Sequence, residues 1–218
     1  MSTTTPKSKA AAHSEAQRDR ILCAAHRCFI ESGFHAASMA SIAKTAEISA
    51  GLIYRYFDSK NAIILAIIKK YIDEVHADIQ ELRRFPETLE RRIVERFMEW
   101  RRNESKGCLE PGLFLEIVAL GTRDPQVATA LRAADQRIRA ELHDWLLQAW
   151  RQAGRELKET EISQRIFALQ DFFEGLILRS IKQPDVDLHL LRASLQPLFA
   201  YLLPEQLPNQ PLESTNPR

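Results

Sequence analysis

Residues 38–60 gather side chains that can donate hydrogen bonds to an extended, anionic ligand. Hydroxyl, phenol and amine groups of this kind bind phosphate oxygens of nucleic acids. We expect such phosphate contacts from Ser38, Lys44, Tyr54, Tyr56 and Lys60. Arg55 carries a guanidinium, the group that can make a two-pronged contact with guanine in the major groove. The chemistry predicted for this segment is therefore recognition of duplex DNA.

Two short helices and a tight turn are the elements that would position these groups. Ser38 and Ser49 are favourable N-cap residues, so the sequence predicts one helix from residue 38 and a second over 49–56. Ile53 and Phe57 are four residues apart and share a face, which we expect to be buried. Such a compact pair is typical of a helix-turn-helix, whose second helix lies in the major groove.

The opposite face of the second helix is expected to meet the DNA. It begins at Ser49 and carries Ala50, Gly51, Leu52, Tyr54 and Arg55. Gly51 would let the backbone approach closely, and the Ala50 and Leu52 side chains could touch thymine methyl groups. Two alternatives remain open, because Tyr54 could instead be a core aromatic and Arg55 a solvated surface charge.

The stretch I-S-A-G-L-I-Y-R-Y-F-D-S-K at residues 48–60 resembles the signature of the TetR (tetracycline-repressor-like) regulators. Upstream, residues 20–34 resemble the first helix of that family and its closing glycine–aromatic corner, so the specific likeness covers roughly residues 18–65. Glu47 departs from the pattern, which usually has Gly in this turn. A non-glycine residue there must tolerate an unusual backbone angle or a slightly altered turn.

Composition and charge suit a soluble helical protein. The 218 residues are 45% hydrophobic and 27% charged, and no apolar run approaches the ~20 residues that span a bilayer. The net charge is +1, but residues 1–61 hold eight basic and five acidic side chains, so the excess of basic groups lies at this end. No signal peptide is recognised, and three cysteines cannot form a disulfide framework, so we expect a cytoplasmic location.

The chain shows no useful strand-like alternation, which predicts an all-α fold with a small DNA-reading domain and a larger helical bundle. We expect a disordered tail over 1–13, a helix-turn-helix domain over 14–61, a ligand-binding and dimerisation domain over 62–203, and a disordered Pro-rich tail over 204–218. Helices are predicted at about 14–32, 59–84, 87–104, 110–121, 125–153, 161–182 and 187–202, with Gly33, Pro86, Gly154 and Pro184 as breaks.

One helix-turn-helix makes few contacts, so a homodimer with recognition helices roughly 34–36 Å apart is expected on a palindromic operator. The apolar stripes of 125–153 and 161–182 are the candidate interface. Its residues would be Leu131, Ile138, Leu142, Trp145, Leu169, Phe172 and Leu176. The alternative is that these stripes only fill the core of the monomer.

The family resemblance also implies a small-molecule effector, bound in the C-terminal bundle, that shifts the protein away from DNA. Candidate pocket residues are Phe97, Trp100, Arg101, Phe114, Phe167, Gln170 and Phe173. This set favours an apolar or aromatic effector, although an aromatic stripe can equally be core. Cys108 could be a reactive thiol sensor or a buried structural cysteine, and Cys23 and Cys28 are predicted to be small core residues.

Two other classes of protein fit less well. A metal enzyme of the helical-bundle type needs two Glu-x-x-His pairs, and this chain offers only Asp73-x-x-His76, so no metal, cofactor or catalytic residue is expected. A helical carrier without DNA binding would gain nothing from the ordered Ser49, Arg55, Tyr56 and Lys60. The sequence therefore favours a DNA-binding regulator, with a repressor preferred over an activator.

Overall fold

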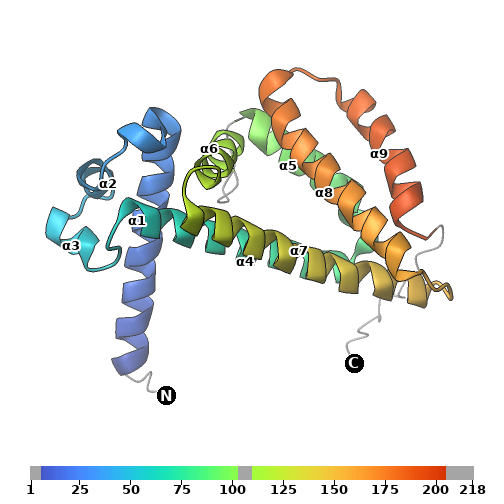
Figure 1. Ribbon diagram of the computed structural model, residues 1–218, viewed down its shortest axis with the longest axis horizontal. Helices are drawn as coiled ribbons and strands as arrows, with labels where there is room; N and C mark the ends of the chain where they lie inside the picture. Colours follow the sequence, from blue (N-terminus) through green and yellow to red (C-terminus); the bar gives the residue numbers. More distant parts are fainter. Residues whose placement is uncertain (1–5, 103–109, 205–218) are drawn as a thin grey trace, which may run out of the picture. The chain divides into compact units, whose positions relative to one another are not determined.

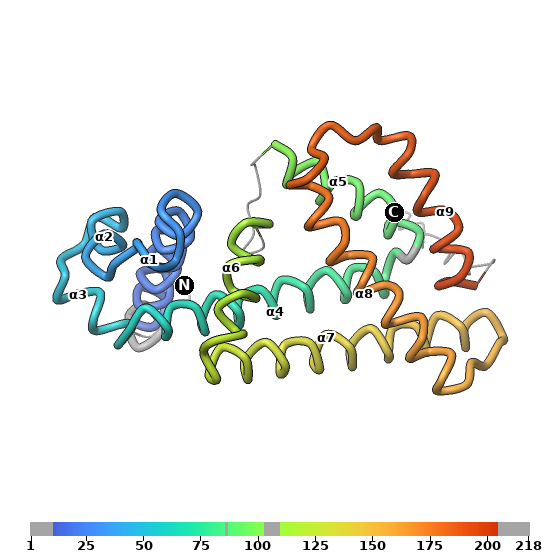
Figure 2. Tube along the Cα trace, turned by 45° about the horizontal axis from the view of Figure 1, so that its top comes forward, coloured from blue at the N-terminus to red at the C-terminus, as the bar shows by residue number. Residues whose placement is uncertain are grey.

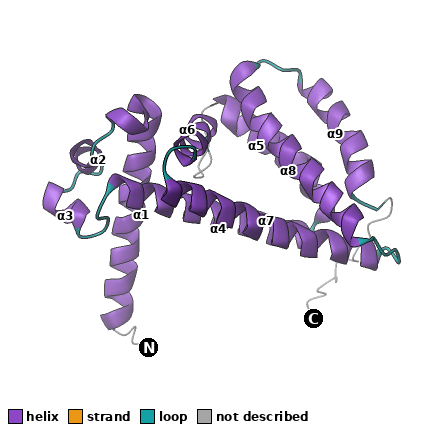
Figure 3. Cartoon of the chain, in the orientation of Figure 1, coloured by secondary structure: helices purple, strands orange, loops and turns teal. Residues whose placement is uncertain are grey.

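A computed structural model describes residues 6–102 and 110–204, and in that part of the chain it consists of helices joined by turns, with no strand (Figures 1 and 3). The helices are α1 (Pro6–Ala36), α2 (Met39–Thr45), α3 (Ala50–Tyr54), α4 (Lys60–Arg84), the 3₁₀ turn η1 (Pro86–Thr88), α5 (Leu89–Arg102), α6 (Pro111–Gly121), α7 (Pro125–Gln152), α8 (Glu159–Lys182) and α9 (Leu188–Leu202). The predicted all-α fold is confirmed. None of the described helices is long and apolar enough to cross a membrane.

The chain divides into two compact units. Unit 1 comprises residues 1–74 and 105–135, and unit 2 comprises residues 75–104 and 136–218. The long helices α4 and α7 each contribute to both units. Unit 1 therefore extends past residue 61, where the sequence suggests a boundary, because the first half of α4 and the helix α6 share its core.

The core of unit 1 joins the two short helices to α1, α4 and α6. Ile42 of α2 and Ile53 of α3 are fully buried, and they share one cluster with Phe29 of α1, Ile67 of α4 and Leu113 of α6. The predicted burial of Ile53 and Phe57 is confirmed by the structure. This burial fixes the two short helices against the longer ones, which leaves the opposite face of α3 free.

The first helix differs from its prediction at both ends. It begins at Pro6, so residues 6–13, expected to be disordered, are the first turns of α1. At the other end Gly33 has φ 74° and ψ 161°, a conformation outside the helical region that glycine adopts readily. The chain is helical again for Phe34–Ala36, so Gly33 interrupts the helix rather than ending it. The expected tail beyond Pro204 lies outside the described residues.

Unit 2 is built from α5, α8 and α9 with the adjoining ends of α4 and α7. Its core contains Phe97, Trp145 and Leu146, each at most 2% exposed. Figure 2 shows α8 and α9 as neighbours joined by a short connection. Trp150 donates a hydrogen bond through Nε1 to the carbonyl of Leu202 (2.9 Å), which attaches the end of α9 to α7.

His143 makes the stability of unit 2 depend on pH. Its Nε2 lies 3.1 Å from Glu159 Oε2 and its Nδ1 lies 3.3 Å from Asp144 Oδ1. The hydrogen bond to Glu159 raises the pKa of His143 above 6.5, and Asp144 adds to the effect against desolvation. Because the folded state holds this proton more tightly, the stabilisation is complete below pH 6.5 and is lost as the pH rises through the folded-state pKa.

We therefore expect the urea midpoint of the wild type to decrease as the pH is raised from about 6 to about 8. The decrease should be larger than that of His143→Gln over the same range. Urea unfolding at several pH values measures the difference. Equal pH profiles for the two proteins would contradict the assigned role of His143.

Candidate nucleic-acid interface

Serine side chains cap both short helices, as the sequence predicts. The Ser38 hydroxyl accepts a hydrogen bond from the Ser41 amide (3.0 Å), and the Ser41 hydroxyl accepts one from the Ser38 amide (2.9 Å). This is a capping box, in which two otherwise unpaired amides are satisfied reciprocally. The Ser49 hydroxyl accepts from the amide of Leu52 (3.2 Å) at the start of α3. Both serines thus have structural roles as well as their predicted place at the interface.

The turn between α2 and α3 adopts the left-handed conformation at Glu47. Its φ is 53°, so the unusual backbone angle expected for a residue replacing glycine is present. The amide of Ile48 donates to the carbonyl of Ala43, and the amide of Glu47 donates to that of Lys44, both at 3.0 Å. These two bonds form a Schellman motif, whose left-handed position glycine usually occupies.

Replacing Glu47 by Gly should raise the free energy of unfolding by about 0.5–1 kcal/mol, because the left-handed strain of an L-residue is relieved. The Glu47–Arg20 ion pair (2.9 Å) lies on the surface and contributes little. Urea unfolding measures the change. Glu47→Gln is the matched control, since it removes the ion pair but keeps the strain and should change stability by less than about 0.5 kcal/mol. A loss of stability in Glu47→Gly would show that the turn does not strain Glu47.

The outer face of α3 is available to a ligand. Ala50, Gly51 and Arg55 are exposed, and Tyr54 is 54% exposed, so Tyr54 is not a core aromatic. A Cβ added at Gly51 would meet nothing within 4 Å. Among the described residues the Arg55 side chain has no hydrogen-bond or ionic partner. Tyr54 and Arg55 therefore present a phenol and a guanidinium side by side at the end of the helix.

The other residues predicted to contact DNA differ in how exposed they are. Leu52 and Tyr56 are half-buried, and both lie on the margin between the exposed face and the core. Lys44 is exposed near the end of α2, which leaves its ammonium available for a phosphate. Ser38 is also exposed, although its hydroxyl already serves the capping box.

Lys60 is not positioned as a phosphate clamp, which corrects the sequence-based expectation. Its Nζ donates to the carbonyls of Phe34 (2.5 Å), Ala37 (2.7 Å) and His35 (3.3 Å), so the three ammonium hydrogens are all used inside the protein. It also lies 4.4 Å from the centre of the Phe34 ring. Desolvation lowers the pKa of Lys60, as expected for a cation enclosed by protein. Lys60 therefore holds the end of α1 against the start of α4.

Sequence reasoning missed four residues that hold this interface in place. Arg18 donates to the carbonyl of Tyr56 (3.3 Å) and lies over the Phe57 ring, 4.2 Å from its centre. In α6, Glu116 Oε2 accepts from the amide of Phe34 (2.5 Å). The side-chain amide of Asn61 donates a hydrogen bond to Asp124 Oδ2 (2.5 Å), which connects α4 to the start of α7. No local sequence signal marks these contacts, because the partners lie 38 to 82 positions apart.

The residues predicted to line an effector pocket have different surroundings in the structure. Phe97 and Trp100 are buried, and Trp100 meets Phe173 edge to face with ring centres 6.0 Å apart, which is ordinary core packing. Phe167 is 61% exposed, and Phe114 belongs to unit 1. Arg101 donates to the carbonyl of Val186 (3.2 Å), while Gln170 is half-buried on α8. Cys108 lies outside the described residues.

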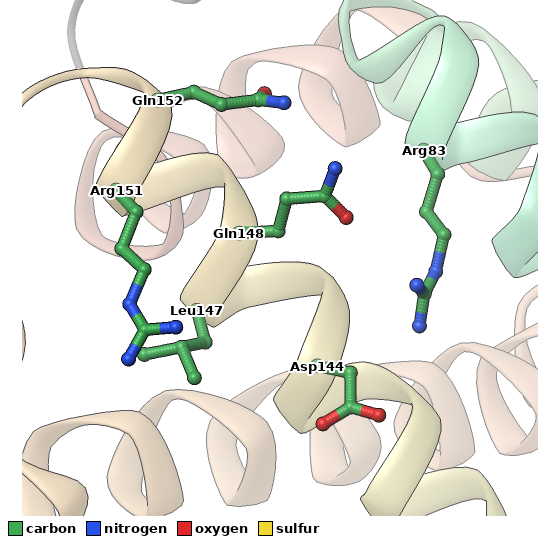
Figure 4. Close-up of a pocket in the computed structure, with 6 residues that line it drawn as sticks. All are labelled: Arg83, Asp144, Leu147, Gln148, Arg151 and Gln152. Carbon is green, nitrogen blue, oxygen red and sulfur yellow. The ribbon is translucent and has the colours of Figure 1, made fainter.

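A depression of about 530 Å³ does occur in unit 2, but with another lining (Figure 4). Its residues are Arg83, Asp144, Leu147, Gln148, Arg151 and Gln152. Five of these six residues carry charged or amide groups, and none of them is aromatic.

Most of the predicted dimer residues are core residues. Leu142, Trp145, Leu169 and Leu176 are buried within the chain itself, and Leu131, Ile138 and Phe172 are half-buried. A side chain that its own chain already covers cannot supply a new interface. The exposed large apolar residues of α8 are instead Phe167, Leu178 and Ile181, and those of α9 are Leu190 and Tyr201. Cys28 is a core residue as predicted, whereas Cys23 is exposed.

Among the described residues no group of three or more His, Cys, Asp or Glu side chains could hold a metal ion. Asp73 pairs with Lys69 (2.8 Å), and His76 pairs with Glu141 (2.6 Å), so the Asp73-x-x-His76 spacing does not create a joint site.

Capped short helices, a Schellman turn and an exposed α3 face define a helix-turn-helix protein. A family model described as "Bacterial regulatory proteins, tetR family" matches residues 21–67. Over 120 residues the chain is 42% identical to the HTH-type transcriptional regulator UidR of Escherichia coli K12, covering 53% of this chain and 57% of that protein. Over 94 residues it is 30% identical to the HTH-type transcriptional activator FasR of Mycolicibacterium smegmatis, covering 42% of this chain and 43% of that protein.

The matches thus span 57% of the length of UidR and 43% of the length of FasR. Salmonella enterica GusR has a similar solved structure, with a TM-score of 0.63 and 29% identity over 86% of this chain and 95% of that one. Residues 21–67 of the chain therefore match the TetR family of bacterial regulatory proteins. The family is one of regulators rather than enzymes, in agreement with the interpretation from sequence.

Proposed function

We propose that this protein is a cytoplasmic transcriptional regulator that binds a palindromic operator as a homodimer and leaves it when a small molecule binds. The observation that carries the proposal is the exposed end of α3, where Tyr54 and Arg55 project from a helix that Ser49 and Ile53 hold in place. A free guanidinium on a short, exposed helix suits readout of guanine in the major groove. A carrier that never binds DNA would have no use for this arrangement.

The test is DNA binding by the full chain. Fluorescence anisotropy with duplexes from the region flanking the gene should show a complex that weakens steeply with salt and survives excess competitor DNA. Arg55→Ala should weaken specific binding by roughly 10-fold to 100-fold, as expected for loss of one base contact. Arg91→Ala removes the same charge from an exposed site in unit 2 and should stay within about twofold. Equal affinities for both variants would contradict the proposal.

Repression is proposed rather than activation. The relatives named above do not decide between the two, since UidR is described as a regulator and FasR as an activator. Expression of a reporter gene behind the bound operator, with and without the protein, shows whether the protein represses or activates transcription.

A small-molecule effector is supported by two solved structures of the same fold, Bacillus subtilis FadR in complex with stearoyl-CoA and the SmeT–triclosan complex. At 17% and 18% identity these share the fold, and their ligands are not carried over to this chain.

The homodimer is proposed to form through α8 and α9. Leu178 and Ile181 lie 11 and 14 positions after Phe167. Both separations are close to whole helical turns, so the three side chains lie along one face of α8. Leu190 on α9 is also exposed. An exposed apolar stripe on two neighbouring helices is typical of an interface with another protein chain.

Replacing Phe167 by Glu should convert the protein from a dimer to a monomer of 25.0 kDa, because a buried unpaired carboxylate opposes association. Light scattering after size-exclusion chromatography measures the mass. The control is Phe85→Glu, which changes a similarly exposed phenylalanine away from α8 and should remain dimeric. A monomeric wild type, or a dimeric Phe167→Glu, would contradict the interface.

A further inference from the structure

The depression in unit 2 lies between the end of α4 and the last turns of α7. Arg83 comes from α4, and the other lining residues come from successive turns of α7 (Figure 4). Its volume of about 530 Å³ lies within the range of small-molecule sites. Figure 4 shows the Gln148 side chain extending from α7 towards Arg83.

Arg83 is the most informative residue of the lining. It is half-buried, and its Nε is buried without a hydrogen-bond partner among the described residues. Its Nη2 makes one long hydrogen bond, to the carbonyl of Glu141 at 3.5 Å. Arginine is rarely placed within a protein without an anion, because taking its charge out of water is costly. Within the part of the chain that the structure describes, this guanidinium therefore lacks the anionic partner that would stabilise it.

The nearest carboxylates along α7 are already engaged. Glu141 accepts a hydrogen bond from His76 through Oε2 (2.6 Å) and forms an ion pair with Arg137 through Oε1 (3.5 Å). Asp144 lies 3.3 Å from His143. Neither carboxylate forms an ion pair with Arg83, so within residues 6–102 and 110–204 no acidic side chain neutralises this group.

The remaining lining adds donors rather than negative charge. Arg151 is a second guanidinium, and Gln148 and Gln152 offer amide N–H groups. Against these stands the single carboxylate of Asp144, so the lining carries a net positive charge. Guanidinium and amide donors together are the groups that bind carboxylates and phosphates in proteins.

We infer that this depression binds a small ligand bearing an oxyanion, a carboxylate or a phosphate, through Arg83 with Gln148 as a second donor. The ligand completes the hydrogen bonding that Arg83 lacks. That such a ligand is the effector rests on the proposed function, whereas the binding itself does not. The ligand class differs from the apolar effector that the aromatic residues suggested.

Binding is tested on the full chain without DNA, by isothermal titration calorimetry with inorganic phosphate and with malonate at constant ionic strength. We expect one saturable site per chain, and the tighter of the two probes identifies the oxyanion. Arg83→Gln should weaken binding at least tenfold. Arg84→Gln is the matched control, since Arg84 is the next residue of α4, is well exposed and pairs only weakly with Glu81 (3.8 Å); it should stay within twofold.

Gln148→Leu provides an independent variant at an exposed position, where misfolding is not expected, and it should weaken binding severalfold. Absence of saturable binding by both probes up to 100 mM, or equal affinities for Arg83→Gln and Arg84→Gln, would overturn the inference.

The two proposals fail in different ways. If the protein binds the anion but no DNA, the site stands and the proposed regulator does not. If it binds DNA but neither anion, the site is wrong and the regulator stands. If both bind, the anion should weaken the DNA complex of the wild type and of Arg84→Gln but not that of Arg83→Gln. An equal response of Arg83→Gln would overturn the role of Arg83.

Discussion

Replacing Lys60 by Met should lower the free energy of unfolding of unit 1 by about 2–3 kcal/mol, a large effect for a change at the start of a helix. The ammonium donates to three carbonyls at the end of α1, those of Phe34, His35 and Ala37. The last carbonyls of a helix have no partner within it. Each carbonyl left unsatisfied costs about 1 kcal/mol or more, and the contact with the Phe34 ring is lost as well.

Urea unfolding followed by circular dichroism measures this loss. Lys69→Met is the matched control, because Lys69 lies on the same helix but is exposed and pairs only with Asp73 at i+4. Its cost should be below about 0.5 kcal/mol. DNA affinity should fall with Lys60→Met but not with Lys69→Met, since Ala37 directly precedes the Ser38 cap of α2. Similar stabilities for the two variants would show that Lys60 is a surface charge.

Replacing Glu116 by Ala should destabilise the same unit by about 1–3 kcal/mol. Gly33 interrupts α1, so the amide of Phe34 cannot donate within a regular helix, and it donates instead to Glu116 Oε2 (2.5 Å). A charged acceptor makes this a stronger hydrogen bond than a neutral one. Without Glu116 the amide loses the partner that compensates for the break at Gly33.

Glu116→Gln separates this role from simple loss of charge, because the amide oxygen still accepts a hydrogen bond. It should cost less than half as much as Glu116→Ala in the same urea experiment. The double variant Lys60→Met with Glu116→Ala tests whether the two contacts act together, since they hold the carbonyl and the amide of one residue, Phe34. We expect a coupling of at least about 0.5 kcal/mol. Strict additivity would mean that the two contacts are independent.

Local signals in the sequence were sufficient for the elements of the DNA-binding part. Ser38 and Ser49 cap their helices because the capping bond joins residues only three positions apart. The strain at Glu47 follows from the turn that links two helices so close in sequence. The break at Gly154, with φ 72°, and the start of α7 at Pro125 are similarly local. Ala10, Ala11 and Ala12 are good helix formers, so local propensity also favours the start of α1 near Pro6.

Tertiary structure alone decided which apolar faces are covered and which charges are engaged. Helical spacing shows that Leu142 and Trp145 share a face, but not that their own chain buries that face while Phe167 stays exposed. Likewise, nothing near Lys60 in sequence announces the carbonyls 23 to 26 positions away that occupy its ammonium. Caps and turns depend on bonds between neighbours in the chain, so the sequence by itself determines them. Burial and long-range hydrogen bonds depend on which helices meet, and only the folded structure brings those partners together.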